Sequence, residues 1–231
     1  MILAAGLGTR LRPFTDTRPK ALLEVRGKTL LEHAIERARE AGATRIIVNV
    51  HHHADQVERF LRQRDFGVDT CVSDERDALR DTGGAIRHAR HLFVPALPVL
   101  VHNVDVISNV DLVALRRVHE DRHDRATLVV QPPASPRVLR FDDEGRLTGW
   151  ENRDTGEQKI VNSSFHSSFP FSFCGIQLLS PLFIHSISLQ GSFSIIDELL
   201  AQALLPTPPR AFLHHGSCTD HGLFIPSTPT V

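Results

Sequence analysis

The sequence predicts an α/β protein with three layers, built around a doubly wound, mostly parallel, Rossmann-like sheet. Short β-branched runs such as residues 45–50 alternate with amphipathic segments at a steady pace along the first half of the chain. Runs that are apolar along their whole length are typical of parallel strands buried on both faces. Ligands of such sheets gather at the carboxyl ends of the strands, so functional residues are expected in the loops there.

The first half supplies the alternating elements. The first predicted helix ends at Gly42, and its apolar positions repeat at helical spacing: Leu30, Leu31, Ala34, Ile35 and Ala38. The alternation then continues with strands expected at 45–50, 68–73, 98–105 and 126–131, and with helices at 54–64, from Gly83-Gly84 onward, and at 111–120. Asp111 is expected to cap the last of these helices, with Asn109 as its competitor.

After residue 131 the pattern changes. Two short strands, 138–141 and 146–150, flank a glycine turn and predict a β-hairpin. Residues 151–170 are expected to form a loop that contains a strand, and a further strand is expected at 171–178. Helices follow at Ser180-Pro181 and at 194–205. The sequence contains no repeat or linker, so residues 1–231 are interpreted as one domain.

Composition narrows the classes of function. The chain has 231 residues, of which 41% are hydrophobic and 23% charged, and its net charge of −1 favours neither nucleic-acid nor membrane binding. Its three cysteines have no Cys-x-x-Cys spacing, and no leader segment or apolar run of roughly 18 residues is present. These features favour a cytoplasmic protein. The first strand is very short, which leaves open whether residues precede Met1.

The first twenty residues predict a phosphate-binding loop, because an apolar strand end leads directly into a loop rich in small and basic residues. Its small residues let backbone N–H groups approach phosphates, and they are Ala4, Ala5, Gly6 and Gly8. Arg10 and Lys20 add positive charge. The spacing lacks both the Gly-Lys-Ser/Thr ending of a P-loop and the third glycine of a dinucleotide-binding loop.

This stretch, L-A-A-G-x-G-T-R-L-R-P-x-T-x-x-x-P-K-x-L, resembles the signature of the sugar-1-phosphate nucleotidyltransferases. L-V-x-N-x-D at residues 100–105 resembles the family's metal-binding aspartate motif, and Thr82-Gly83-Gly84 resembles its T-G-G segment. The resemblance implies the nucleotide-diphospho-sugar transferase fold, with nucleotide bound by residues 1–131 and sugar by residues 132–231. It also implies a reaction that joins a nucleoside triphosphate to a sugar 1-phosphate and releases pyrophosphate.

The resemblance also assigns roles to particular residues. It makes Arg10, Lys20 and Asp105 catalytic, with Arg10 on the triphosphate and Lys20 between the two phosphates. It places the nucleotide against Leu3, Ala4, Ala5, Gly6, Gly8, Thr9, Arg10, Thr82, Gly83 and Gly84. Mg²⁺ is the expected cofactor, held by Asp105 and by Asp220, which keeps the family's Asp-x-Gly spacing but has different neighbours. The alternative is that these aspartates are ordinary cap or turn residues.

The sugar-binding candidates are Asn103, Glu151, Asn152 and Gly175. Residues 173–176 resemble the family's strand in which a glycine lies under the sugar ring, and Trp150-Glu151-Asn152 resembles a segment that reaches sugar hydroxyls. The alternative is that the polar residues are simply solvated. The histidines at 51–53 are not predicted to bind one metal ion, because consecutive residues of an extended chain point to opposite faces. The histidines at 214–215 are not predicted to bind zinc, because their spacing fits no common zinc site.

The sequence is therefore interpreted as a Mg²⁺-dependent nucleotidyltransferase that uses a nucleoside triphosphate and a sugar 1-phosphate. It most resembles the stand-alone uridylyltransferases that act on N-acetylmuramate or hexosamine 1-phosphates. A mannose-1-phosphate guanylyltransferase and a phosphocholine cytidylyltransferase are alternatives. So is a non-catalytic nucleotide-sensing module, since the Asp220-His221-Gly222 turn is modified and the tail after it is short. The base, the sugar and the oligomeric state are left open.

Overall fold

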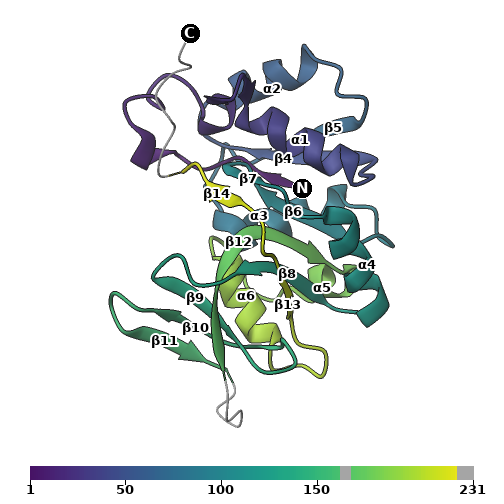
Figure 1. Cartoon of the computed structure of the whole chain (residues 1–231). Helices are drawn as coiled ribbons and strands as arrows, with labels where there is room; N and C mark the ends of the chain where they lie inside the picture. The colour runs from purple at the N-terminus through teal and green to yellow at the C-terminus, as the bar shows by residue number, and fades with distance from the viewer. Residues whose placement is uncertain (162–167, 223–231) are drawn as a thin grey trace.

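The computed structural model describes residues 1–161 and 168–222, and it has the layered α/β architecture that the sequence predicts (Figure 1). The strands of the main sheet are β1 (Ile2–Leu3), β4 (Arg45–Val50), β5 (Asp69–Asp74), β6 (Val99–Asn103), β8 (Ala126–Gln131), β9 (Arg137–Phe141), β10 (Leu147–Asn152), β11 (Glu157–Ile160), β12 (Phe169–Leu179) and β13 (Arg210–Leu213). Two small pairings lie outside it: β2 (Glu24–Val25) with β3 (Lys28–Thr29), and β7 (Val106–Ser108) with β14 (Cys218–Asp220).

The main sheet has a parallel part and an antiparallel part. Its order is β11-β10-β9-β12-β6-β1-β4-β5, and β8 lies between β12 and β13. Strands β6, β1, β4 and β5 are mutually parallel, with Ile2 in register with both Val48 and His102. The long strand β12 runs antiparallel to β6, β8 and β9. The predicted doubly wound sheet is thus confirmed, and its second half is completed by antiparallel strands.

Helices cover both faces of the sheet. They are α1 (Leu30–Glu40), α2 (Ala54–Arg62), α3 (Asp81–Ala89), α4 (Leu112–Arg122), α5 (Pro181–His185) and α6 (Ile195–Gln202). Along β4, Ile46 and Val48 pack with α1 and α2, whereas Ile47 packs with α3. Successive side chains of a strand point to opposite faces, so both faces of β4 are buried and its sequence is apolar throughout. In the described part of the chain, no helix has the length and apolar character needed to cross a bilayer.

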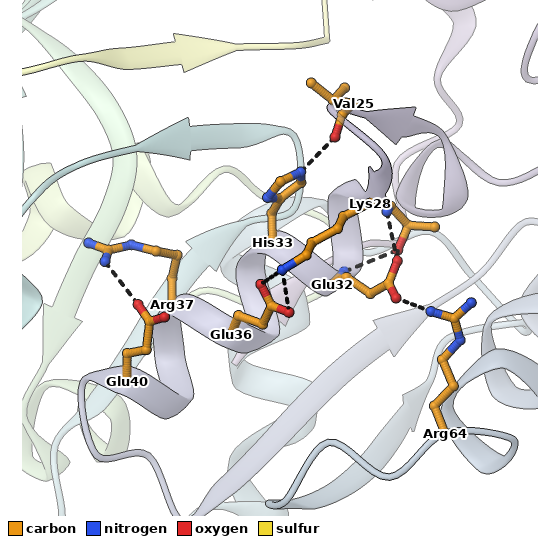
Figure 2. Close-up of polar contacts among 9 residues, drawn as sticks. Val25, Lys28, Glu32, His33, Glu36, Arg37, Glu40 and Arg64 are labelled. Carbon is orange, nitrogen blue, oxygen red and sulfur yellow. Dashed lines mark hydrogen bonds and ion pairs between the residues drawn. The ribbon is translucent and has the colours of Figure 1, made fainter. Parts of the chain in front are cut away.

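Helix α1 begins with a capping box that the sequence analysis did not include. The Thr29 side chain accepts a hydrogen bond from the Glu32 N–H at 3.1 Å, and the Glu32 carboxylate accepts one from the Thr29 N–H at 2.7 Å. Figure 2 shows this cap together with the ion pairs Glu32–Arg64 and Lys28–Glu36. The box satisfies N–H groups that the first helical turn would otherwise leave without partners.

The predicted cap of α4 is confirmed, and one predicted strand is shorter than expected. Asp111 is the cap of α4, since its Oδ1 accepts from the Ala114 N–H at 2.8 Å, whereas the Oδ1 of Asn109 accepts from the Ser217 N–H. The strand expected at 98–105 ends at Asn103, because the chain turns at 104–105 before β7. The hairpin is confirmed as β9 and β10, and the strand expected within 151–170 is β11. Residues 162–167 of that segment lie outside the described residues.

Helix α3 begins at Asp81 and not at Gly83-Gly84, where its start was expected, so the two glycines lie inside its first turn. A Cβ on Gly83 would lie 2.4 Å from the ring of Phe193, and one on Gly84 would lie 2.4 Å from the carbonyl oxygen of Gly191. Both distances are far shorter than any van der Waals contact. These glycines therefore allow α3 to pack closely against the segment that leads into α6.

Replacing Thr29 by alanine is expected to lower the free energy of unfolding by about 1 kcal/mol, because the N-terminus of α1 loses its side-chain cap. Urea denaturation measures this loss as a lower midpoint at an unchanged slope. Thr29→Ser, which keeps a hydroxyl acceptor, is the matched control and is expected to retain most of the stability. Equal destabilisation by both substitutions would contradict a capping role.

Candidate active site

Lys20 and Asp105 form an ion pair at the carboxyl edge of the parallel strands. Asp105 lies in the turn directly after β6, and Lys20 begins a short 3-10 helix, Lys20–Leu22, that follows the N-terminal loop. The Lys20 Nζ contacts the Asp105 Oδ2, and the two side chains are only 11% and 14% exposed. The ammonium group therefore balances a carboxylate that is largely shielded from water, as a partly buried charge requires.

Asp220 is brought to the same place by the pairing of β14 with β7. Asp220 lies opposite Val106 in this antiparallel pair, directly beside the Asp105 turn. The next residue, His221, donates its backbone N–H to the carbonyl oxygen of Asp105 at 2.8 Å. The two aspartates that the sequence predicts as metal ligands thus lie together, although they are distant in the sequence.

Gly222 marks the point where the charged groups converge. A Cβ on this residue would lie 2.6 Å from the Lys20 Nζ, 2.7 Å from the Asp220 Oδ1 and 2.8 Å from the Asp105 Oδ2. Its backbone N–H also donates to the Asp220 Oδ1 at 2.6 Å. A side chain at this position would push the three groups apart, so the glycine of the Asp-x-Gly turn has a direct steric reason.

The electrostatics of the cluster favour an added cation. The pKa of Asp220 is raised above its ordinary value, first because protein atoms displace water from its carboxylate and second because Asp105 repels its negative charge. The Gly222 N–H and the positive charges of Lys20 and Arg10 act in the opposite direction. Arg10, although exposed, therefore lies close enough to act electrostatically on Asp220.

The donor set fits a magnesium ion. Among the residues that the structure describes, no group of three or more His, Cys, Asp or Glu side chains is arranged around one point, and Asp105 and Asp220 form a pair of carboxylates. Mg²⁺ is usually bound by one or two carboxylates, with waters and substrate phosphates as its other ligands. Two hard oxygen donors at the carboxyl edge of the sheet are thus a suitable partial ligand set.

The N-terminal loop folds back onto Lys20 through Gly8. Gly8 has a φ of +63°, and a Cβ there would lie 2.7 Å from the Thr15 Cγ2 and 3.3 Å from the Lys20 Cβ. The Thr15 hydroxyl donates to the Gly8 carbonyl oxygen at 2.9 Å and closes the loop. Gly6 differs, because a Cβ there would meet nothing within 4 Å. The loop is therefore open beside Gly6 and closely packed at Gly8.

The amide of Ala4 corrects one detail of the predicted phosphate loop. Its N–H donates to the Oδ1 of Asn49 at 2.7 Å, and Asn49 in turn donates to the Oε1 of Glu75 at 3.0 Å. This N–H is therefore occupied within the protein and is not free to approach a phosphate. Asn49 and Glu75 are both buried, and burial raises the pKa of Glu75. The sequence analysis predicted a role for neither residue. The signal that could have indicated one is the polar Asn49 inside an otherwise apolar strand.

The predicted nucleotide residues Thr82, Gly83 and Gly84 lie in the first turn of α3, at the carboxyl edge of the sheet. The N–H groups of Gly83 and Gly84 donate to the carbonyl oxygen of Phe193 at 3.0 and 3.3 Å, and the Thr82 hydroxyl accepts from the Ile195 N–H at 2.9 Å. The resemblance to the family places the nucleotide against these glycines. The structure explains them by packing, and their contact with a nucleotide stays a prediction.

The predicted sugar residues fall into two groups. Asn103 and Gly175 are brought together across β6 and β12: Gly175 has a φ of +68°, and a Cβ there would lie 2.7 Å from the Asn103 Nδ2. Glu151 and Asn152 lie on the β9–β10–β11 ribbon. The hydrogen bond from Arg140, at 2.6 Å, lowers the pKa of Glu151, whereas the Asn152 Oδ1 accepts from the Asp154 N–H. Asn103 and Gly175 thus lie side by side, whereas Glu151 and Asn152 lie on a different part of the sheet.

Other features lie apart from this cluster. His51 and His214 make hydrogen bonds to the backbone oxygens of Glu75 and Ser217. A cavity of about 240 Å³ opens at the opposite, amino edge of the sheet, where Arg45 and Val99 line it. None of the predicted site residues contributes to this cavity. The carboxyl edge is therefore the place where the predicted chemistry collects.

The chain is similar in sequence to known proteins. Residues 1–149 match the model of the nucleotidyl transferase family. The chain is 48% identical over 110 residues to the N-acetylmuramate alpha-1-phosphate uridylyltransferase of Caulobacter vibrioides, covering 46% of this chain and 45% of that protein. It is 28% identical over 195 residues to the mannose-1-phosphate guanylyltransferase catalytic subunit beta of Drosophila pseudoobscura pseudoobscura, covering 82% and 50%. The chain thus spans about half the length of these curated relatives.

The fold also matches solved structures. A putative glucose-1-phosphate thymidylyltransferase from Bacillus anthracis, solved in complex with a sucrose, superposes with a TM-score of 0.78. The match covers 97% of this chain and 89% of that one, at 20% sequence identity. At this identity the likeness shows the fold, and it extends over both the parallel and the antiparallel parts of the sheet.

Replacing Asp220 by asparagine is expected to stabilise the metal-free protein at neutral pH. The folded state binds the Asp220 proton more tightly than the unfolded chain, so this group's contribution to stability falls as the pH rises from 3.8, its ordinary pKa, through the raised value. Asparagine removes that cost while keeping an acceptor for Gly222. Thermal denaturation is expected to show a higher Tm for the variant at neutral pH and no difference at acidic pH.

Asp65→Asn is the matched control for this measurement, because Asp65 accepts the same kind of hydrogen bond from the N–H two residues later, Gly67, on the exposed surface. An equal rise of Tm in both variants would show that the effect does not come from the crowded carboxylates. Mg²⁺ is expected to raise the Tm of the wild-type protein more than that of Asp220→Asn, since the variant lacks one anionic donor.

Proposed function

This chain belongs to the nucleotidyl transferase family, and from that membership we propose that it transfers a nucleotidyl group from a nucleoside triphosphate to a sugar 1-phosphate. The products are a nucleoside diphosphate sugar and pyrophosphate. In this proposal the chain acts as one domain, in which residues 1–131 bind the nucleotide and residues 132–231 bind the sugar. The observation that carries it is the convergence of Lys20, Asp105 and Asp220 around Gly222.

The reaction requires two polyanions to approach each other. An oxygen of the sugar phosphate attacks the α-phosphorus of the nucleotide, the new P–O bond forms, and the bond to the β-phosphate breaks to release pyrophosphate. A sugar phosphate is already anionic near neutral pH, so no residue is needed to remove a proton from it. What the protein has to supply is positive charge and alignment.

Lys20 and Arg10 supply positive charge near Asp105 and Asp220. Lys20 is a compact, flexible point charge, and its ion pair with Asp105 places the ammonium at the end of β6 before any substrate binds. Arg10 is exposed on the loop and acts electrostatically on Asp220, a position suited to the outer phosphates. We infer that Lys20 contacts the phosphates that exchange the nucleotidyl group.

Asp105 and Asp220 would hold Mg²⁺, the family's expected cofactor. Bound there, the ion would neutralise phosphate charge and polarise the α-phosphate. The raised pKa of Asp220 supports this assignment, because two carboxylates facing each other repel until a cation lies between them. Lys20 balances Asp105 in the absence of the ion.

Uridine triphosphate and an N-acetylmuramate-like sugar 1-phosphate are the proposed substrates. They are supported by the 48% identity to an N-acetylmuramate alpha-1-phosphate uridylyltransferase. Guanosine triphosphate with mannose 1-phosphate is the second candidate, since the mannose-1-phosphate guanylyltransferase relative is matched over 82% of this chain. The position of Asp220 opposite Val106, beside Asp105, supports an enzyme over the non-catalytic sensing module, because the modified Asp-x-Gly turn still brings its carboxylate to the cluster.

We also propose that the protein acts in a reducing compartment, the cytoplasm that its composition predicts. The cysteines Cys71, Cys174 and Cys218 are all free thiols. Free thiols persist most readily where glutathione and thioredoxin keep them reduced.

Pyrophosphate release is the direct test of this function. UTP, GTP, CTP and dTTP are each incubated with N-acetylmuramate, N-acetylglucosamine, glucose and mannose 1-phosphates in the presence of Mg²⁺, and with phosphocholine for CTP. The expected result is fastest turnover for UTP with N-acetylmuramate 1-phosphate. Nucleotide binding without pyrophosphate release for every pair would favour the sensing module, and preference for GTP with mannose 1-phosphate would favour the second candidate.

Asp105→Ala is expected to abolish turnover, because Mg²⁺ would lose a principal ligand. Lys20→Ala is expected to lower kcat on the order of 10²-fold, because it removes positive charge where phosphate charge develops. Asp69→Ala and Lys28→Ala are matched controls, since Asp69 pairs with Arg45 and Lys28 with Glu36 in exposed ion pairs. Both controls are expected to keep near-normal rates. Circular dichroism checks that each variant is folded. A folded Asp105→Ala enzyme with a normal rate would refute the assignment.

A further inference from the structure

Two of the three cysteines meet beside the active-site cluster. Cys174 lies on β12 immediately before Gly175, and Cys218 begins β14, the strand that ends at Asp220. The Cys218 thiol donates to the carbonyl oxygen of Cys174, with 3.7 Å between the sulfur and the oxygen, and both cysteines belong to one apolar cluster. The two side chains thus lie close together between two strands that carry predicted site residues.

The two thiols differ in how a solute can reach them. Cys174 is only 7% exposed and packs in the apolar cluster under α4, whereas Cys218 is half-buried at the edge of that cluster. A small oxidant therefore meets Cys218 first. Cys174, held behind it, is placed to react second.

Strand β14 is short enough to move with Cys218. It consists of three residues, Cys218–Asp220, and its only strand partner among the described residues is the equally short β7. The segment before it is fastened at Asn109, whose Oδ1 accepts from the Ser217 N–H at 2.8 Å. A displacement of Cys218 is consequently passed along the strand to Asp220.

We propose that Cys174 and Cys218 form a reversible disulfide that lowers turnover at the Lys20–Asp105–Asp220 cluster. The oxidant is a low-molecular-weight disulfide, RSSR. The Cys218 sulfur attacks one sulfur of RSSR and forms a mixed disulfide, and the first RS⁻ leaves and takes up the Cys218 proton. Cys174 then attacks the Cys218 sulfur, and the second RS⁻ leaves with the Cys174 proton. Two protein thiols are oxidised, and RSSR is reduced to two RSH.

The bond is expected to disturb the site because it shortens a non-bonded contact to a covalent length of about 2.0 Å between the sulfurs. Cys218 is drawn toward β12, and Asp220 is drawn away from Asp105 and Lys20. Phosphate transfer depends on the position of such groups to within about 1 Å. The effect on turnover rests on the proposed function, whereas formation of the disulfide does not.

Oxidised glutathione is the probe for the experiment. Treatment of the full chain is expected to join the peptides that contain Cys174 and Cys218 with the loss of two hydrogen atoms, as measured by mass spectrometry under non-reducing conditions. Pyrophosphate release is expected to fall by about tenfold or more and to recover with dithiothreitol. Loss of thermal stabilisation by UTP with Mg²⁺ is a second readout that does not require turnover.

Cys71→Ser is the matched control, because Cys71 is a half-buried thiol on β5, a strand that pairs with β4 and lies at the edge of the main sheet. This variant is expected to respond to oxidised glutathione like the wild-type protein. Cys218→Ser and Cys174→Ala are each expected to be insensitive, and either one suffices if the other fails to fold.

Three results would overturn the proposal: no linkage between Cys174 and Cys218, a linkage that leaves both turnover and ligand stabilisation unchanged, or inhibition that persists in Cys218→Ser. If the reduced protein releases no pyrophosphate with any substrate pair, the proposed function fails. The mass measurement and the thermal readout then still decide whether the disulfide forms and whether it affects the site.

Discussion

Two carboxylates and one ammonium group share the small space around Gly222, and the candidate site depends on this crowding. Lys20 neutralises Asp105, while Asp220 is left with a raised pKa by lost hydration and by repulsion from Asp105. Before it binds anything, the site thus holds a charge arrangement that an additional cation would relieve. In the proposed function, a metal ion bound there would reduce the repulsion between these carboxylates and a phosphate-bearing substrate.

The strands bring these groups together by two different routes. The parallel strand β6 ends at the carboxyl edge and delivers Asp105 to the position where ligands of α/β sheets bind. Asp220 arrives from the other end of the chain on β14, which pairs with β7 immediately after the Asp105 turn. The same short pairing places Cys218 against Cys174 of β12, so the metal-ligand candidate Asp220 and the thiol of Cys218 lie on one strand.

Glycines in this protein serve three distinct physical purposes. Gly8 adopts a left-handed φ that folds the N-terminal loop onto Lys20, and Gly222 leaves room for three charged groups. Gly83 and Gly84 instead allow α3 to pack against the segment before α6. All of these lie in segments that resemble family motifs, yet only the first two have reasons that concern the charged cluster itself. A motif match therefore identifies the segment without identifying what the glycine does.

The sequence by itself determined the alternation of strands and helices and the position of Asp105 after an apolar strand. These follow from local periodicity and from residue chemistry, which need no knowledge of distant contacts. Only the tertiary structure decided that Asp220 faces Asp105, that Asn49 occupies the Ala4 amide and that Cys174 meets Cys218. Such contacts join segments far apart in the chain, and they are set by strand pairing and close packing, which leave no periodic trace in the sequence.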